Sequence, residues 1–96
     1  MNQARTIAVN LLSQAQDSRI ALDQLLNRAE NQIRQLNRPD RSLVHVLVYG
    51  VLRWQSRLDW VIDHLAARNS KIDPMVRTIL RMGLFQIQFL NRIPRY

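Results

Sequence analysis

The 96-residue chain contains no cysteine and only two glycines. Without cysteine it can have no disulfide framework, no thiolate nucleophile and no cysteine-ligated zinc site. Gly50 and Gly83 lie far apart in the sequence, so no glycine-rich loop can hold a phosphate or a nucleotide cofactor. No apolar run approaches the ~18 residues that a membrane-spanning helix needs. We therefore expect a single cytoplasmic domain over residues 1–96, with no membrane partner.

Lysine is almost absent, although the chain is strongly basic. Of the fourteen basic residues only Lys71 is a lysine, and the excess over seven acidic residues gives a net charge of +7. Arginine carries a planar guanidinium that fits phosphates and stacks on bases, so this bias favours a nucleic-acid partner. The alternative is a GC-rich genome that uses arginine in place of lysine everywhere, in which case the charge says little about function.

Apolar residues recur with a 3.6-residue period along the whole chain, and this pattern predicts an all-α protein. The longest such stripe runs over residues 40–65. Ser18 is the expected N-cap of the second helix. We predict five helices, over residues 3–15, from Ser18 to about residue 36, 41–54, 57–68 and 74 to about 90.

The helix boundaries rest on local signals. Pro39 should end the second helix, and Asp40 should cap the third. The run Ser56–Asp59 has the form of a capping box, so it should divide the long stripe into two helices that meet at a bend. Asp73 and Pro74 suit an N-cap followed by the first helical position.

The fifth predicted helix is apolar around most of its circumference, with a narrow polar strip of Arg77, Arg81 and Gln88. Such a helix is normally covered on several sides. We expect the chain to be either a fragment of a longer protein or a subunit that self-associates through this helix. A glycine inside a helix costs about 1 kcal/mol relative to alanine, so we expect Gly50 and Gly83 to mark a close crossing of the third and fifth helices.

Few residues suggest catalysis or metal binding. His45 and His64 are isolated and lack ligand-like spacing to a carboxylate. Asp59 and Asp63 lie one turn apart and could mimic a metal or acid–base pair, but negative charge early in a helix is favourable and nearby arginines can pair with it. We therefore predict no catalytic residues and no metal site.

The arginines fall into two groups. Those on outer faces or in loops can contact nucleic-acid phosphates, whereas those beside apolar stripes are expected to pair with acids between helices. Trp54 and Trp60 could stack on bases, but at these spacings we expect core or boundary positions. The candidates for nucleic-acid binding are Arg5, Arg19, Arg38 and Arg41, and the candidates for structural ion pairs are Asp40, Asp59, Arg53 and Arg81.

Several runs resemble one protein family. They are LVYGVLRWQ at residues 47–55, LDW at 58–60, LRMGLFQ at 80–86 and RIP at 92–94. Together they resemble the N-terminal domain of the Sun/Fmu/RsmB family of ribosomal RNA cytosine-C5 methyltransferases. That domain is similar to the antitermination factor NusB, an all-helical RNA-binding fold, and the resemblance covers essentially the whole chain.

The resemblance implies a five-helix NusB-like bundle that docks ribosomal RNA for a catalytic methyltransferase domain in the same polypeptide. The bundle is truncated relative to the fold, which usually continues with further helices. The parent enzyme would use S-adenosylmethionine, but the cofactor-binding domain and the attacking cysteines of the family are not in these residues. This chain alone is therefore not expected to be an enzyme, and the uncovered fifth helix suggests a homo-oligomer.

Two other functions stay open from the sequence. The chain could be a free-standing NusB-like factor that regulates transcription together with RNA and a ribosomal protein. The GVLRW and RIP runs favour the methyltransferase branch instead. It could also be a helical protein-interaction module whose charge is incidental.

Overall fold

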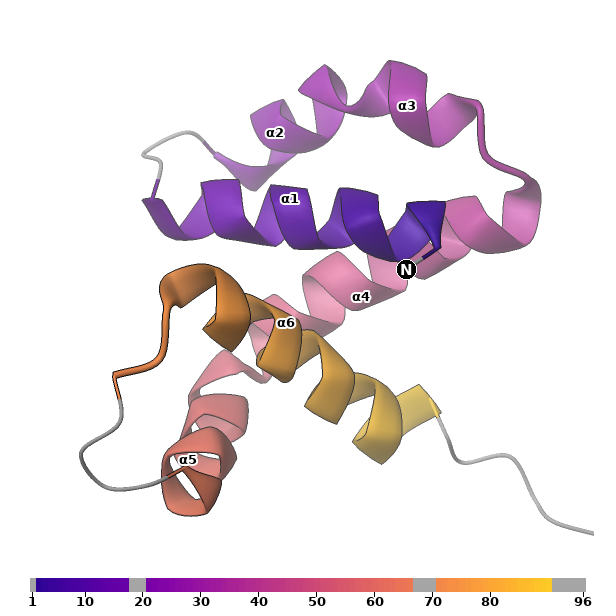
Figure 1. Cartoon of the computed structure of the whole chain (residues 1–96). Coiled ribbons are helices and arrows are strands. Elements are labelled where there is room, and N and C mark those ends of the chain that lie inside the picture. The colour runs from indigo at the N-terminus through magenta and orange to yellow at the C-terminus, as the bar shows by residue number, and fades with distance from the viewer. Residues whose placement is uncertain (1, 18–20, 67–70, 91–96) are drawn as a thin grey trace, which may run out of the picture.

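The computed structural model describes residues 2–17, 21–66 and 71–90, and all regular structure within them is helical (Figure 1). The all-α prediction is confirmed. The elements are α1 (Gln3–Asp17), α2 (Leu22–Arg28), α3 (Glu30–Arg34), α4 (Arg38–Arg53), α5 (Gln55–Leu65), α6 (Pro74–Phe85) and a π-helical turn, η1 (Gln86–Leu90).

The predicted second helix is two helices, so the described residues contain six α-helices where five were expected. The break lies at Ala29, which has φ −90° and ψ 1°. Its N–H is shared between the carbonyls of Leu25 and Leu26, each 3.2 Å away, as is common where a helix turns tight at its end. The apolar periodicity does not reveal this break, because α2 and α3 both turn their apolar side inward. Ser18, the predicted cap, lies outside the described residues, and α2 follows Ala21.

The start of α4 differs from the prediction by one turn. Asn37 is the N-cap, and its Oδ1 accepts the backbone N–H of Asp40 at 2.9 Å. Asp40 therefore lies inside the first turn, where its negative charge still interacts favourably with the positive end of the helix dipole. Pro39 also lies in that turn, because the N–H it lacks would have no helical partner there.

The long stripe is divided as predicted, but not by the predicted capping box. Trp54 separates α4 from α5 with φ −103° and ψ 15°. Its N–H still donates to the Gly50 carbonyl at 3.1 Å, and its carbonyl accepts from the Leu58 N–H at 2.9 Å. The hydrogen bonding thus continues across the bend, and no side chain caps α5. The side chain of Asp59, the last residue of the predicted capping box, instead pairs with Arg77 and Arg81.

The last helix begins as predicted. Asp73 caps α6 by accepting the Met75 N–H at 2.9 Å, and Pro74 occupies the first turn. The helix changes after Phe85 to a π-helical turn that runs to Leu90, the last residue that the structure describes. The preceding helix, α5, ends at Leu65 rather than at the predicted residue 68.

The core lies between α1 and its neighbours. Figure 1 shows α2 and α3 on one side of α1, and α4 and α6 on the other. Ala4 and Ala8 are fully buried on α1, and such small side chains let the backbone of α4 come close. Burying a leucine or valine contributes about 1.5–3 kcal/mol. The buried apolar residues at this centre are Leu11, Leu12, Leu25, Val44, Leu47, Val48, Val51 and Leu58.

Only one of the two glycines marks a helix crossing. A Cβ on Gly50 would overlap the ring of Phe85, so α4 and α6 can meet there only because position 50 has no side chain. Nothing lies within 4 Å of the Cβ position of Gly83, and the prediction for that residue is wrong. Phe85 in turn stacks on Phe89 at 5.1 Å between ring centroids, and Phe89 stacks on Trp54 at 5.3 Å. These rings join the bend to η1.

The orientation of α6 is the largest departure from its hydrophobic pattern. Its two arginines point toward the protein, and Arg81 is only 8% exposed. Much of its apolar surface instead faces solvent, including Val76, Ile79 and Leu80, and Ile87 of η1 is also exposed. Leu65 on α5, which belonged to the predicted buried stripe, is also exposed. No helix among the described residues is both long and apolar enough to cross a membrane.

Candidate nucleic-acid interface

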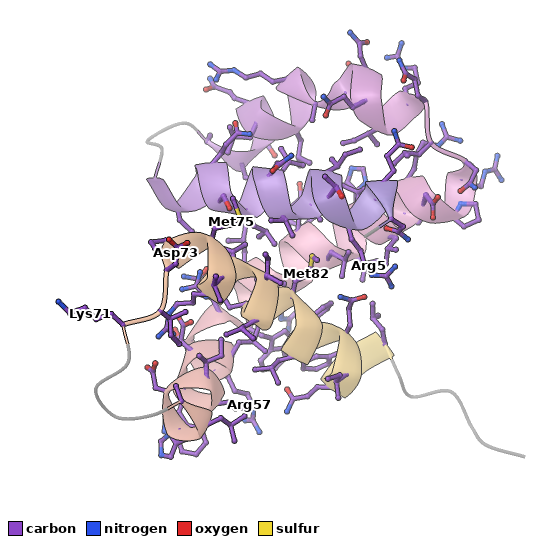
Figure 2. All side chains as sticks on the ribbon, in the orientation of Figure 1. Arg5, Arg57, Lys71, Asp73, Met75 and Met82 are labelled. Atoms are coloured by element: carbon purple, nitrogen blue, oxygen red, sulfur yellow. The ribbon has the colours of Figure 1, made fainter. Side chains whose placement is uncertain are left out.

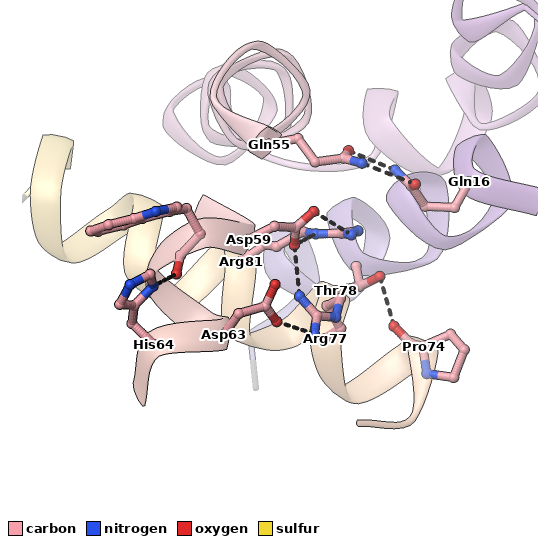
Figure 3. A network of polar contacts seen from close by, with 10 residues as sticks. Gln16, Gln55, Asp59, Asp63, His64, Pro74, Arg77, Thr78 and Arg81 are labelled. Carbon is pink, nitrogen blue, oxygen red and sulfur yellow. Dashed lines mark hydrogen bonds and ion pairs between the residues drawn. The ribbon is translucent and has the colours of Figure 1, made fainter. Parts of the chain in front are cut away.

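The inward arginines of α6 meet the carboxylates of α5 in one network (Figure 3). Arg81 donates to both oxygens of Asp59, from Nε at 2.7 Å and from Nη2 at 3.0 Å. Arg77 donates to Asp59 at 3.1 Å and to Asp63 at 2.7 Å. Each guanidinium group thus makes two hydrogen bonds to carboxylates of α5. These contacts fix the angle between α5 and α6, since a bidentate arginine contact tolerates little rotation.

The network keeps its carboxylate charged. Burial by itself raises the pKa of Asp59, but hydrogen bonds and positive charge from Arg81 and Arg77 outweigh it and hold that pKa below its usual value. The hydrogen bond to Asp63, followed by the one to Asp59, raises the pKa of Arg77. Both arginines are thus occupied by acids. They are unsuited to binding a phosphate, although they border a hollow of about 430 Å³ beside α1.

A second polar contact links α1 to α5 on the same side of the protein. Gln16 and Gln55 exchange two hydrogen bonds between their side-chain amides, of 2.8 and 3.2 Å (Figure 3). Thr78, buried in α6, donates to the Pro74 carbonyl at 3.1 Å. Every buried side-chain nitrogen and oxygen among the described residues has a partner. This side of the molecule is therefore structural rather than a site waiting for a ligand.

Unoccupied positive charge lies on the outer face of α4. Arg38 and Arg41 are one turn apart, and His45 and Tyr49 continue the same helical face at four-residue steps. The Nδ1–H of His45 donates to the Arg41 carbonyl at 3.0 Å, and the rings of His45 and Tyr49 stack with centroids 6.3 Å apart. Arg34 of α3 joins Arg41 and His45 around a hollow of about 290 Å³. We call Arg38, Arg41, His45 and Tyr49 the α4 face.

The four predicted contact residues do not gather at one place. Arg38 and Arg41 lie on the α4 face, with Arg38 exposed and Arg41 half-buried. Arg5 is half-buried, and its Nε donates to Gln86 at 2.7 Å, so it ties α1 to η1. Figure 2 shows Arg5 beside Met82 of α6. Arg19 lies outside the described residues.

The predicted ion-pair residues also separate. Asp59 and Arg81 form the inter-helix pair described above. Asp40 and Arg53 make no ion pair with the residues that the structure describes. The guanidinium of Arg53 lies over the ring of Trp54, 5.6 Å from its centroid.

Sequence reasoning missed two aromatic features. It did not assign His45 and Tyr49 to a surface, although their spacing from Arg41 places all three on one helical face. It also expected Trp60 in the core or at its boundary, whereas Trp60 is 61% exposed. Trp54 lies half-buried at the bend, as expected. No three metal-ligating side chains gather anywhere in the described residues.

Comparisons with known proteins agree with this all-helical arrangement. Residues 2–96 match the NusB family. The chain is 37% identical over 76 residues to "Probable ribosomal RNA small subunit methyltransferase B" of Synechocystis sp., covering 78% of this chain and 16% of that protein. It is 30% identical to the protein of the same name in Bacillus subtilis, covering 94% and 20%, and 30% identical to "Ribosomal RNA small subunit methyltransferase B" of Erwinia tasmaniensis, covering 100% and 22%.

The chain spans only about a fifth of the length of these relatives. No solved structure gives a significant match. The similarity therefore concerns this helical region, and what the whole relatives do is a separate question.

Proposed function

Because the chain belongs to the NusB family, we propose that it is a cytoplasmic RNA-binding domain that docks ribosomal RNA for a cytosine-C5 methyltransferase. The names of the relatives support ribosomal RNA as the partner. The catalytic domain would lie in the same polypeptide, and an open reading frame that continues past residue 96 into a cofactor-binding domain would test this part of the proposal.

The observation that carries the proposal is the α4 face. It presents Arg38 and Arg41 without a carboxylate partner among the described residues, on a chain with a net charge of +7. Arg34 next to it is held by Glu30 at 2.7 Å, but that pair is exposed and contributes little. Phosphates can therefore compete for all three guanidinium groups. His45 and Tyr49 add flat surfaces on which unpaired bases can stack.

The docking role requires no chemistry from these residues. The methyltransferase would use S-adenosylmethionine, and the described residues do not fit that cofactor. Both glycines of the chain lie inside helices, and the arginines beside the hollow near α1 are occupied by aspartates. We therefore assign binding and orientation of RNA to this domain and derive no step of methyl transfer from it.

Filter binding of the 96-residue chain to small-subunit ribosomal RNA fragments, repeated across salt concentrations, tests the proposal. Each phosphate contact contributes about 0.7–0.9 to the slope of log affinity against log salt. Replacing Arg38 or Arg41 by alanine should weaken binding and lower the slope by about one contact each. Lys71→Ala removes the same charge from an exposed position outside the α4 face and serves as the matched control.

Two results would contradict RNA docking by this face. One is an affinity that does not change between low and physiological salt. The other is an equal loss in Lys71→Ala and Arg38→Ala, which would indicate a diffuse charge effect. A wild-type chain that binds no RNA would instead favour a helical protein-interaction module.

We also propose that the outer face of α6 binds a second copy of the chain. Val76, Ile79, Leu80 and Ile87 are exposed there, and an exposed apolar face of this kind usually marks an interface. Gly83 lies among them with no neighbour within 4 Å of its Cβ position, so another helix can approach closely. Both arginines of α6 point inward. Two copies of this face can therefore meet about a two-fold axis without bringing charges of the same sign together, which matters for a chain of net charge +7.

Sedimentation velocity at micromolar concentration tests this association. Val76→Glu should convert a dimer to a monomer, because it places a carboxylate in the apolar contact. Val46→Glu is the control, since Val46 on α4 is 43% exposed and Val76 is 47% exposed. A wild-type monomer, or an equal effect of the two variants, would argue against an α6 interface.

A further inference from the structure

The outward side of α5 and of the bend before it carries a row of basic and aromatic side chains. Arg53, Arg57, Trp60 and His64 follow one another at steps of four, three and four residues, and all four are exposed. Within α5 this spacing places Arg57, Trp60 and His64 on one side of the helix, opposite the buried Leu58 and Ile62. Arg53 is the last residue of α4, directly before the bend. We call the four residues the α5 row.

Trp60 is fixed in orientation by its own helix. The His64 ring lies against the indole, with centroids 3.9 Å apart. The Nδ1–H of His64 also donates to the Trp60 carbonyl at 2.9 Å, which holds the imidazole in this position (Figure 3). One side of the indole is therefore supported while 61% of the residue stays exposed. A preoriented aromatic ring loses little conformational entropy when a ligand stacks on it.

The other neighbours of Trp60 leave space beside it. Ser56, Arg57, Trp60 and Val61 line an open hollow of about 490 Å³, on the side toward the start of α5. Figure 2 shows Arg57 extending outward from α5. An arginine one turn before a tryptophan can cover the second side of a flat group placed in such a hollow, or contact a phosphate next to it.

The acids of α5 do not oppose an anionic ligand at this row. Asp59 accepts from Arg77 and Arg81, and Asp63 accepts from Arg77, so both carboxylates are neutralised on the α6 side. Arg53 and Arg57 form no ion pair with the described residues. The α5 row is therefore positive, and it combines charge with a supported indole.

We propose that the α5 row is a second RNA contact, in which an unpaired base stacks on Trp60 and the adjoining phosphates contact Arg53 and Arg57. His64 is a positioning residue that supports the indole. The inference rests on the proposed RNA-binding function and extends it by a second, separate site that contacts single-stranded RNA. An RNA is favoured over a protein partner because the row is positively charged and both carboxylates of α5 are held by Arg77 and Arg81.

Binding of the full chain to a fluorescent 12-nucleotide single-stranded RNA, and to a duplex RNA of the same length, tests the second contact. Trp60→Ala should weaken binding to the single strand about tenfold or more, the range for loss of one stacked base. Duplex binding should change little, because paired bases cannot stack on a side chain. The salt dependence should also stay constant, since no charge is removed. Trp60→Phe should recover part of the affinity.

Leu65→Ala is the control, because Leu65 is 75% exposed on the same helix but lies off the row. His64→Ala should reproduce part of the Trp60→Ala loss on the single strand and none on the duplex. Wild-type affinity of Trp60→Ala for the single strand would overturn the α5 row and favour a protein contact, while leaving RNA binding by the α4 face intact. A wild-type chain that binds neither RNA would refute the proposed function itself.

Discussion

Replacing Asp59 by asparagine should destabilise the protein far more than the same change at Asp63. Asp59 accepts three hydrogen bonds from two arginines, and the side chain of Arg81 that it pairs with is only 10% exposed. Asparagine keeps the shape of the side chain but removes its charge and replaces one acceptor oxygen with a donor. Arg81 would then be a buried cation without a counter-charge.

The magnitude follows from this burial. Removing one partner of a fully buried ion pair costs about 3–5 kcal/mol. Water reaches part of this pair, because the Asp59 side chain is 27% exposed, so we expect a loss of about 2–4 kcal/mol. A domain of this size has a total unfolding free energy of about 5–14 kcal/mol, and each 1 kcal/mol lowers Tm by about 4–8 °C. The asparagine variant should therefore still fold, with a much lower Tm.

Urea unfolding followed by circular dichroism at 222 nm measures the effect. Asp63→Asn removes the charge of one ion pair at a side chain that is 61% exposed, so it should cost less than about 1 kcal/mol. The double variant Asp59→Asn, Arg81→Gln should be more stable than the sum of the single changes indicates, since it removes the unpaired cation. Equal losses in Asp59→Asn and Asp63→Asn would show that the network does not hold α5 to α6.

Three further predictions concern the same helices. The folded-state pKa of Asp59 lies below its unfolded value of about 3.9, so the stability that its ionised form contributes is complete above that value and is lost as pH falls through the folded pKa. The difference in unfolding free energy between wild type and Asp59→Asn should therefore shrink from pH 6 to pH 3. A constant difference would contradict the stabilising role of the ionised Asp59. Gly50→Ala should lower stability by about 1–2 kcal/mol, because overpacking against the buried Phe85 ring exceeds the gain in helix propensity. Gly83→Ala should instead raise stability by about 0.5–1 kcal/mol, when it is measured below the concentration at which the chain self-associates. Asn37→Ala should cost about 1 kcal/mol in urea unfolding and Asp40→Ala less, because Asn37 is the cap.

The candidate sites were only partly predictable from residue pattern. Arg41 could be placed on an outer face because the buried side of its helix is clear from Val44, Val48 and Val51. Arg38 was expected before that helix and lies in its first turn. Arg5 has the same kind of position in its own helix, but its guanidinium is held by Gln86, which lies 81 residues later in the chain. No local pattern contains a contact over that separation.

Helix starts show how close the competing local signals are. Asn37 and Asp40 are both good caps on either side of Pro39, and the structure uses the first. The extra turn became possible because proline is tolerated within the first turn of a helix. At Asp73 and Pro74 there is no such competition, and the predicted start is the observed one.

The sequence by itself determined the helical class and the division of the long stripe over residues 40–65 into two helices, because both depend on periodicity or on neighbours within a turn. It also determined that α6 would have apolar surface left over. Which side of α6 faces inward was decided only by the tertiary structure. The hydrophobic pattern alone would turn the strip of Arg77 and Arg81 toward solvent, but the carboxylates of Asp59 and Asp63 hold that strip inside. That orientation exposes Val76 and Leu80, and leaves the unpaired arginines of α4 and α5 at the surface.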